Sequence, residues 1–198
     1  MQRKLMFAVL GTLAGLVAIW AVAFARPYQM HGSEIMPPMA APPIELARAD
    51  ESTYNLQNAS GSVSLLFFGY TTCPDVCPTT MADFKKIKSD LGPLADRVQL
   101  IFITVDPQRD TIQRTAEYAA GFDTQFIGLS GSEAELKPVW SAYGVYRQIQ
   151  EGQSAAGYLV DHSSRIYLVD THGNLRLTYM YGTSPEDISD DVRFILRE

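Results

Sequence analysis

Two cysteines, Cys73 and Cys77, lie four residues apart in the segment TTCPDVCPTT. If a helix begins near Cys77, both sulfur atoms lie on one face, because residues four apart are neighbours on a helix surface. The partial positive charge at the start of such a helix favours the thiolate form. Thiolates bind soft metal ions and attack disulfides, so the pair predicts metal binding or thiol-disulfide exchange.

A structural disulfide is the alternative interpretation of this pair, since the spacing permits the Cα separation that a disulfide needs. A bridge that closes so short a loop removes little conformational entropy from the unfolded chain. A chain of 198 residues with 46% hydrophobic composition can bury a core without it. The pattern therefore favours a chemical role for the thiols.

A third ligand has to come from one of the three histidines of the chain. His172 lies in the turn sequence THGN, where a polar surface residue is usual. His162 falls between two predicted strands and is the candidate third ligand, with an ordinary turn histidine as the alternative. Two thiolates and one imidazole suit copper or zinc, because both metals accept soft ligands.

The elements around the cysteines place them after the carboxyl end of a central strand. Residues 62–70, SVSLLFFGY, form a nearly continuous apolar run that is typical of a central strand buried on both faces. Residues 81–92, MADFKKIKSDLG, have apolar residues at helical spacing and end at a glycine. Open α/β sheets place their functional sites at such strand-to-helix junctions.

The rest of the chain alternates strands and helices. Further strands are predicted at 98–105, 126–129, 145–149, 157–160, 165–169 and 175–180. Further helices are predicted after a cap at Asp110-Thr111, after a capping box of Ser132 and Glu135, and after Ser184-Pro185. This order predicts an α/β fold with a mainly parallel central sheet, covered by helices on both faces.

An uncharged apolar run of 21 residues occupies positions 5–25. At about 1.5 Å per residue, a helix of this length crosses a hydrocarbon core of about 30 Å. Arg3 and Lys4 precede the run and few basic residues follow it, which predicts a cytoplasmic amino terminus and an exported domain. A signal peptide ending at Ala23-Phe24-Ala25 is the alternative. Without an Arg- and Ser-rich presequence, we expect a single-pass protein of a bacterial cell membrane with a periplasmic domain.

Residues 26–43 contain five prolines and no hydrophobic periodicity, which predicts an extended linker between a membrane anchor at 1–25 and a domain at 44–198. His31, Met30, Met36 and Met39 lie in this segment and are ligand types that copper accepts. An irregular tether that only happens to contain them is the favoured interpretation, because ordering a flexible segment costs free energy.

The charge of the chain excludes one class of function. The formal net charge is -6 and the isoelectric point is about 5.0. Nucleic-acid binding needs a basic stripe, and the basic residues here are scattered among acidic ones.

Four segments of the chain resemble the Sco/SenC family of copper proteins in sequence and in order: FFGYTTCPDVCPTTMADF, ITVDPQRDT, FIGLSG and VDHSSRIYLVD. The resemblance covers nearly all of residues 44–198. It implies a thioredoxin-like fold, and one copper ion, Cu(I) or Cu(II), bound by Cys73, Cys77 and His162. It also implies a role in assembling the binuclear copper centre of cytochrome c oxidase.

The charged residues that accompany these motifs are not expected to be metal ligands. They are Asp75, Asp106, Arg109, Asp110 and Asp161. A carboxylate is a poor ligand for Cu(I). We therefore expect Asp106 in a turn, Asp110 as a helix cap, and Asp161 as a neighbour of His162.

Two functions follow as hypotheses. The first is a metallochaperone that passes copper to subunit II of cytochrome c oxidase, with a copper donor chaperone and a thioredoxin-like reductant as further partners. The second is a thiol-disulfide oxidoreductase that keeps the acceptor cysteines reduced, with Cys73 attacking and Cys77 resolving.

Overall fold

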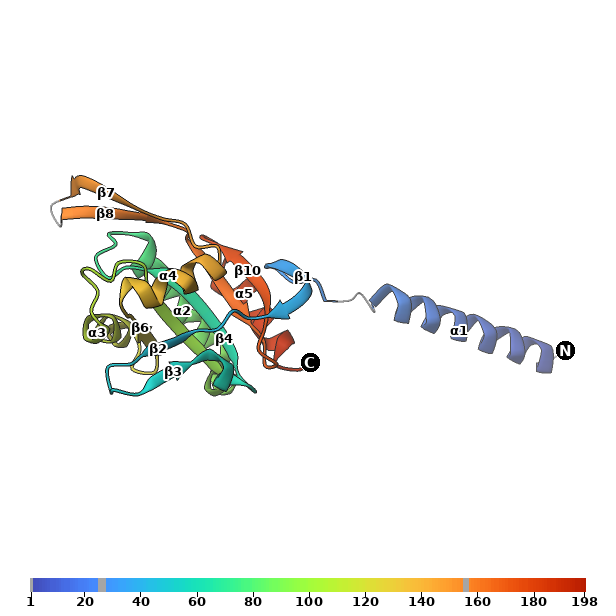
Figure 1. Ribbon diagram of the computed structural model, residues 1–198. Coiled ribbons are helices and arrows are strands. Elements are labelled where there is room, and N and C mark those ends of the chain that lie inside the picture. The colour runs from blue at the N-terminus through green and yellow to red at the C-terminus, as the bar shows by residue number, and fades with distance from the viewer. Residues whose placement is uncertain (1, 25–27, 155–156) are drawn as a thin grey trace.

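The computed structural model describes residues 2–24, 28–154 and 157–198 (Figure 1). Helix α1, Gln2–Phe24, stands apart from the domain that the remaining elements form. Its large apolar side chains are exposed to solvent, among them Phe7, Leu16 and Trp20. Among the described residues, no helix combines the length and the apolar character that a membrane crossing requires.

A six-stranded sheet forms the centre of the domain, in the order β1-β10-β9-β4-β5-β6. Its strands are β1 (Ser33–Ala40), β4 (Val63–Gly69), β5 (Val98–Thr104), β6 (Ile127–Leu129), β9 (Arg165–Val169) and β10 (Asn174–Met180). Only the pairs β4–β5 and β5–β6 are parallel, and the other three pairs are antiparallel. The prediction of a mainly parallel sheet is therefore wrong, and the sheet is mixed. A short turn joins β9 to β10, and such a turn can only connect antiparallel neighbours.

Helices cover both faces of the sheet, as predicted. They are α2 (Val76–Leu91), α3 (Ile112–Phe122), α4 (Glu133–Ala142) and α5 (Pro185–Ile195). Phe67 of β4 packs against Phe84 of α2, whereas the next residue, Phe68, packs against Tyr143 at the end of α4. Successive residues of a strand point to opposite faces, so α2 and α4 lie on opposite sides of β4. Helix α5 packs beside α2.

The expected caps are present in most helices. Ser132 and Glu135 form a capping box at the start of α4, and Ser184 with Pro185 begins α5. The remaining elements are the 3-10 helices Leu56–Ala59 and Gly92–Arg97, the hairpin of β2 (Glu45–Ala47) with β3 (Thr53–Asn55), and the hairpin of β7 (Arg147–Ser154) with β8 (Gly157–His162). Figure 1 shows the β7–β8 hairpin projecting from the side of the domain opposite to α1.

Part of the segment predicted as a linker belongs to the folded domain. Residues Ser33–Ala40 form the edge strand β1, which pairs with β10. The expectation of an irregular segment was wrong here, because pairing with β10 orders a sequence that has no periodicity of its own. Met36 and Met39 lie on this strand with exposed side chains.

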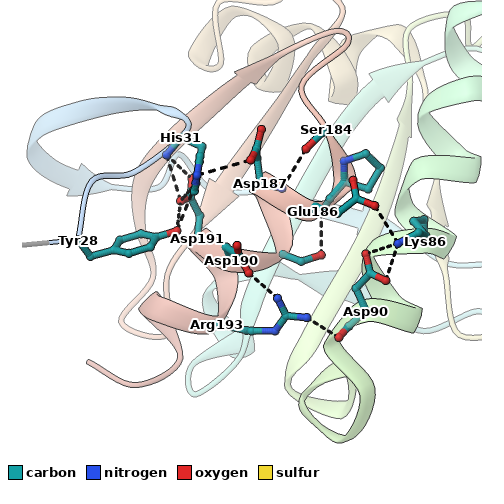
Figure 2. A network of polar contacts seen from close by, with 12 residues as sticks. Tyr28, His31, Lys86, Asp90, Ser184, Glu186, Asp187, Asp190, Asp191 and Arg193 are labelled. Carbon is teal, nitrogen blue, oxygen red and sulfur yellow. Dashed lines mark hydrogen bonds and ion pairs between the residues drawn. The ribbon is translucent and has the colours of Figure 1, made fainter.

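The residues just before β1 are fixed to helix α5 by the buried carboxylate of Asp191 (Figure 2). Asp191 accepts hydrogen bonds from the Tyr28 hydroxyl (2.7 Å) and from the backbone amides of His31 and Gly32 (both 3.0 Å). The imidazole Nδ1 of His31 lies 2.9 Å from the same carboxylate, and the Tyr28 ring stacks on Phe194. We call Tyr28, His31, Gly32 and Asp191 the N-terminal clasp.

Candidate metal centre

The two cysteines occupy the junction between β4 and α2. Cys77 is the second residue of α2 and is fully buried, whereas Cys73 lies in the preceding loop and is partly exposed. Both are free thiols, and the Cys77 amide donates a hydrogen bond to the Cys73 sulfur at 3.4 Å. The predicted position of Cys77 in the first helical turn is confirmed.

His162, the last residue of β8, completes a group of three soft ligands. Its Nε2 lies 3.6 Å from the Cys77 sulfur, and the ligand atoms of Cys73, Cys77 and His162 all lie within 4.8 Å of one another. Nδ1 lies 3.1 Å from the Ser163 carbonyl oxygen. A proton on Nδ1 donates to that carbonyl and leaves the Nε2 lone pair directed at the sulfurs.

Aromatic rings and an open pocket surround these ligands. The rings of Phe67 and Tyr70 meet the imidazole of His162 edge-on, with centroids 6.2 and 5.7 Å away. A surface pocket lined by Tyr70, Cys73, Pro74, Leu159 and His162 gives access from solvent. The site therefore has a buried side at Cys77 and an open side at Cys73.

The other histidines are engaged elsewhere. His31 is held by Asp191 in the N-terminal clasp, and His172 lies in the turn between β9 and β10, where its amide donates to Asp170. The structure therefore brings His162, and neither of the other two, to the cysteines.

The two thiols have opposite acid–base properties. A hydrogen bond from Cys77 lowers the pKa of Cys73 to about 4 against the opposing effect of burial, with a smaller contribution from His162. Burial strongly raises the pKa of Cys77, and the hydrogen bond to Cys73 raises it further. In the metal-free protein one thiolate thus sits at the open side of the site, while the inner sulfur keeps its proton.

Comparison with known proteins identifies the family of the chain. A family model described as SCO1/SenC matches residues 35–197, which is most of the chain. The chain belongs to the SCO1/SenC family. A SCO2-like protein of Rickettsia conorii is 33% identical over 151 residues, which make up 76% of this chain and 74% of that protein.

Solved structures of this family share the fold. A structure of Bradyrhizobium japonicum ScoI with copper bound matches with a TM-score of 0.71 and 34% identity, and covers 79% of this chain and 99% of its own. A structure of Arabidopsis thaliana ScoI with copper bound matches with a TM-score of 0.73 and 33% identity, over 80% of this chain and 98% of its own. The predicted family and the thioredoxin-like fold are confirmed.

Asp110 anchors the cysteine loop of this SCO1/SenC protein, which corrects its predicted role as a helix cap. Its buried carboxylate accepts hydrogen bonds from the Thr71 amide (2.9 Å), the Thr71 hydroxyl (2.6 Å) and the Thr104 hydroxyl (2.8 Å). The next residue, Thr111, caps α3 by accepting a hydrogen bond from the Arg114 amide. Because its carboxylate points inward, Asp110 ties the segment before Cys73 to the end of β5.

The loop after β5 is connected to the β7–β8 hairpin by three residues, Asp106, Arg109 and Tyr158. We call these residues the Arg109 clamp. Sequence reasoning placed Asp106 in a turn, which is correct: the Asp110 amide donates to its carbonyl. It did not anticipate that the buried Asp106 carboxylate contacts both Arg109 and Tyr158. The only signal was the presence of Asp106 and Arg109 in the motif VDPQRDT.

Asp161 only flanks His162. Its carboxylate accepts a hydrogen bond from the Gln150 side chain at 2.8 Å and lies on the exposed face of the hairpin. The imidazole is instead oriented by the Ser163 carbonyl.

Proposed function

We propose that this protein is a metallochaperone that binds one copper ion through Cys73, Cys77 and His162. The observation that carries the proposal is the convergence of two sulfurs and one imidazole nitrogen within 4.8 Å beside an open pocket. This donor set fits copper, because thiolate and imidazole are ligands that copper accepts and carboxylates are absent from the group. The copper bound in the two ScoI structures supports the same assignment.

The residues divide the work of copper uptake. Cys73 offers a thiolate at the open side and captures the ion first. Cys77 then becomes a ligand by releasing its proton to solvent, because a metal ligand must be deprotonated and the nearby positive charge favours the thiolate. His162 supplies Nε2 from the hairpin.

Transfer uses the open side of the same site. Three protein ligands leave a coordination position for an incoming sulfur or nitrogen of the acceptor. Cys73 is the more exposed of the two cysteines, so it exchanges before the buried Cys77. From the family resemblance, we infer that the acceptor is subunit II of cytochrome c oxidase during assembly of its binuclear copper centre. A copper donor chaperone and a thioredoxin-like reductant would load and reduce the site.

We also propose, from the sequence of residues 5–25, that the N-terminal segment anchors the protein in a bacterial cell membrane, with the domain on the periplasmic side. Residues 5–25 are uncharged, and the large apolar side chains described on α1 have no protein core around them. Arg3 and Lys4 orient the amino terminus toward the cytoplasm. Extraction with alkaline carbonate tests the anchor: the full chain stays with the membrane, and release into the supernatant contradicts it.

The copper site is tested with the full chain in detergent, reduced under anaerobic conditions and titrated with Cu(I) against a competing chelator. We expect the wild type to retain one copper per chain after desalting. Cys73→Ser and His162→Ala should lose it, whereas His172→Ala is the matched control and should keep it. A wild type that releases copper on desalting contradicts the proposal.

The acid–base properties of the cysteines favour a second candidate function, reduction of the acceptor disulfide. The Cys73 thiolate would attack one acceptor sulfur, forming a mixed disulfide and releasing one acceptor thiolate. Cys77, after losing its proton, would attack the Cys73 sulfur and release the second acceptor thiolate. The acceptor gains two electrons, Cys73 and Cys77 become a disulfide, and a thioredoxin-like reductant restores them.

His162→Ala separates the two functions because an imidazole is needed for copper and not for disulfide exchange. If the variant exchanges thiols normally but fails to support oxidase assembly in cells, the chaperone function is correct. If oxidase assembly in cells is unaffected, the reductase function replaces it.

A further inference from the structure

We propose that Arg109 is the positioning residue of the metal centre: it holds the β7–β8 hairpin against the cysteine loop and so keeps the imidazole of His162 facing the sulfurs. The inference rests on the proposed copper site, whose third ligand is the last residue of β8. Arg109 does not itself contact the three ligand atoms. It acts through Tyr158 and Tyr70.

The hairpin needs such a device because it forms a separate two-stranded sheet. Within the described residues, β7 and β8 pair only with each other, and no strand of the six-stranded sheet pairs with them. Backbone hydrogen bonds to the central sheet therefore do not fix its position. Side-chain contacts at its base have to do so, and Figure 1 shows how far the hairpin extends from the domain.

Arg109 makes the densest set of these contacts. Its Nε pairs with the buried carboxylate of Asp106 at 2.5 Å, and its Nη1 donates to the Tyr158 carbonyl oxygen at 2.9 Å. The guanidinium also lies over the Tyr158 ring, 3.7 Å from the centroid. The Tyr158 hydroxyl returns to Asp106 at 2.7 Å, which closes the ring of contacts.

The same guanidinium reaches the cysteine loop on its other side. It lies 5.6 Å from the ring centroid of Tyr70, the residue that follows β4. Tyr70 in turn packs edge-on against His162, 5.7 Å away. Arg109 thus contacts one aromatic ring on the hairpin, four residues before His162, and another on the loop that leads to Cys73.

A second contact at the hairpin base does not replace this one. Arg147 of β7 donates to the Val105 carbonyl and lies over Trp140 of α4. These contacts hold the first strand of the hairpin, whereas Tyr158 lies on the strand that ends in His162. On that strand the Arg109 clamp acts beside a hydrogen bond between the Val160 backbone and the Tyr70 side chain, and it is the clamp that also ties the strand to the loop after β5.

Arginine is required here rather than any cation. A planar guanidinium can stack on a ring while its N–H groups bind a carboxylate and a carbonyl, and a lysine ammonium cannot do all three. Arg109→Lys keeps the charge beside buried Asp106 and removes the stacking. Tyr158→Phe keeps the ring and removes the hydroxyl, with its bond to Asp106 and its longer bond to Gln108. Arg176→Lys is the matched control, since Arg176 is similarly half-buried in ion pairs on β10, remote from the hairpin.

The first measurement uses the full chain in detergent without metal. Hydrogen exchange is followed at the amides of β7 and β8, with β4 and β5 as internal references. We expect exchange in the hairpin to be about tenfold faster in Arg109→Lys, with a smaller increase in Tyr158→Phe and none in Arg176→Lys. Equal hairpin exchange in wild type and Arg109→Lys overturns the inference. Faster exchange in β4 and β5 as well would mean that Arg109→Lys destabilises the whole domain. In that case Tyr158→Phe is the deciding variant, and hairpin exchange equal to that of the wild type overturns the inference.

The second measurement follows the ligand in the copper-loaded proteins. A displaced outer contact typically lowers metal affinity about 10- to 100-fold, so we expect a loss of that order in Arg109→Lys. The electron paramagnetic resonance spectrum of the Cu(II) form should lose nitrogen coupling from His162. Unchanged affinity and coupling overturn the inference. A wild type that binds no copper overturns the proposed function instead. The hydrogen exchange of the metal-free protein then still tests whether Arg109 positions the hairpin.

Discussion

At the scale of single residues, the site depends on how differently two identical side chains are placed. Cys73 is partly exposed and accepts a hydrogen bond from Cys77, whereas Cys77 is enclosed at the start of α2. The first arrangement favours a thiolate and the second favours a thiol. Under the proposed function, Cys73 therefore binds copper first and Cys77 binds it second.

The ionisation of Cys73 predicts its reactivity toward alkylating reagents. Because the pKa of Cys73 is lowered to about 4, the metal-free protein should be alkylated at Cys73 at a nearly constant rate down to about pH 5, roughly one unit above that value. An ordinary cysteine, with a pKa of about 8.5, reacts about tenfold more slowly for each pH unit below it. Mass spectrometry after timed iodoacetamide treatment measures the rates. An alkylation rate at Cys73 that falls with pH as for an ordinary cysteine contradicts the prediction. Cys77 is the internal control and should stay unmodified.

Gly69 gives Cys77 its place beside the end of β4. A Cβ atom at this position would lie 2.8 Å from the Cys77 sulfur and 2.9 Å from the rings of Phe67 and Phe102. Gly69→Ala should therefore cost about 1–3 kcal/mol of unfolding free energy and displace the sulfur, which weakens copper retention. Urea unfolding and copper titration measure the two effects. Gly61→Ala is the control: the added atom meets open space, but an alanine is strained at a φ of 90°, so this change should affect stability alone.

At the scale of elements, the N-terminal clasp shows how a segment without its own periodicity joins the fold. Asp191 lies on α5, and it collects donors from the segment that precedes β1 and from Tyr179 of β10. Gly32 is needed there, because a Cβ atom would lie 2.7 Å from the Tyr179 ring. The clasp therefore joins three elements at one edge of the sheet.

Removing the Asp191 carboxylate should release this edge. Asp191→Ala leaves buried donors without an acceptor, which costs about 2–3 kcal/mol of unfolding free energy. Protease cleavage before residue 41 should become faster as β1 detaches. Asp190→Ala is the control, since Asp190 is exposed and pairs with Arg193. An Asp191→Ala protein as stable as Asp190→Ala would show that the clasp is unimportant.

The clasp also predicts a pH dependence. The bond to Asp191 raises the pKa of His31, so its contribution is complete below the ordinary histidine pKa of about 6.5 and is lost as the pH rises through the raised value. Burial raises the pKa of Asp191, but the bonds from Tyr28, His31 and Gly32 outweigh it and the pKa is lowered. The Asp191 contribution is thus lost as the pH falls through that lowered value. The difference in unfolding free energy between wild type and His31→Ala should be largest at pH values between the lowered pKa of Asp191 and the raised pKa of His31. An equal difference at pH 5 and pH 9 contradicts this prediction.

At the scale of the whole molecule, the candidate metal centre lies between two regions whose strands do not pair with each other. Cys73 lies in the loop after β4 and Cys77 at the start of α2, whereas His162 lies on the β7–β8 hairpin. Copper bound by all three would connect the hairpin to the domain. Binding to the folded state alone stabilises it by mass action.

Copper loading should therefore raise the melting temperature of the full chain. At a free copper concentration of 100 times the dissociation constant, the gain is about 2.7 kcal/mol. Calorimetry with and without Cu(I) measures it, and a chelator should reverse it. His162→Ala should show a much smaller gain. An equal gain in that variant would mean that the hairpin takes no part in binding.

The clasp also limits how far the domain can move from α1. As an 18-residue linker, residues 26–43 would span up to about 60 Å. With Tyr28 fixed to Asp191, only the chain between Phe24 and Tyr28 separates α1 from the domain, and four steps of chain span at most about 14 Å. If α1 is the anchor, the domain stays close to the membrane surface.

The sequence by itself determined the features that depend on neighbouring residues. The buried strands β4, β5 and β9, the capping box at Ser132, the cap at Ser184 and the helical position of Cys77 all follow from local patterns of polarity and hydrogen bonding. The structure brings His162 to the two cysteines, whereas spacing alone had left the choice of histidine open. The family motifs supplied what spacing did not.

Only the tertiary structure decided what depends on residues far apart in the chain. His162 meets Cys77 across 85 positions, β1 pairs with β10, and the Asp110 carboxylate turns inward to Thr71 and Thr104 rather than capping α3. Such contacts leave no local periodicity, because their partners are brought together by the packing of the sheet. The arrangement of the candidate metal centre, with the Arg109 clamp and Asp110 beside it, belongs to this second group.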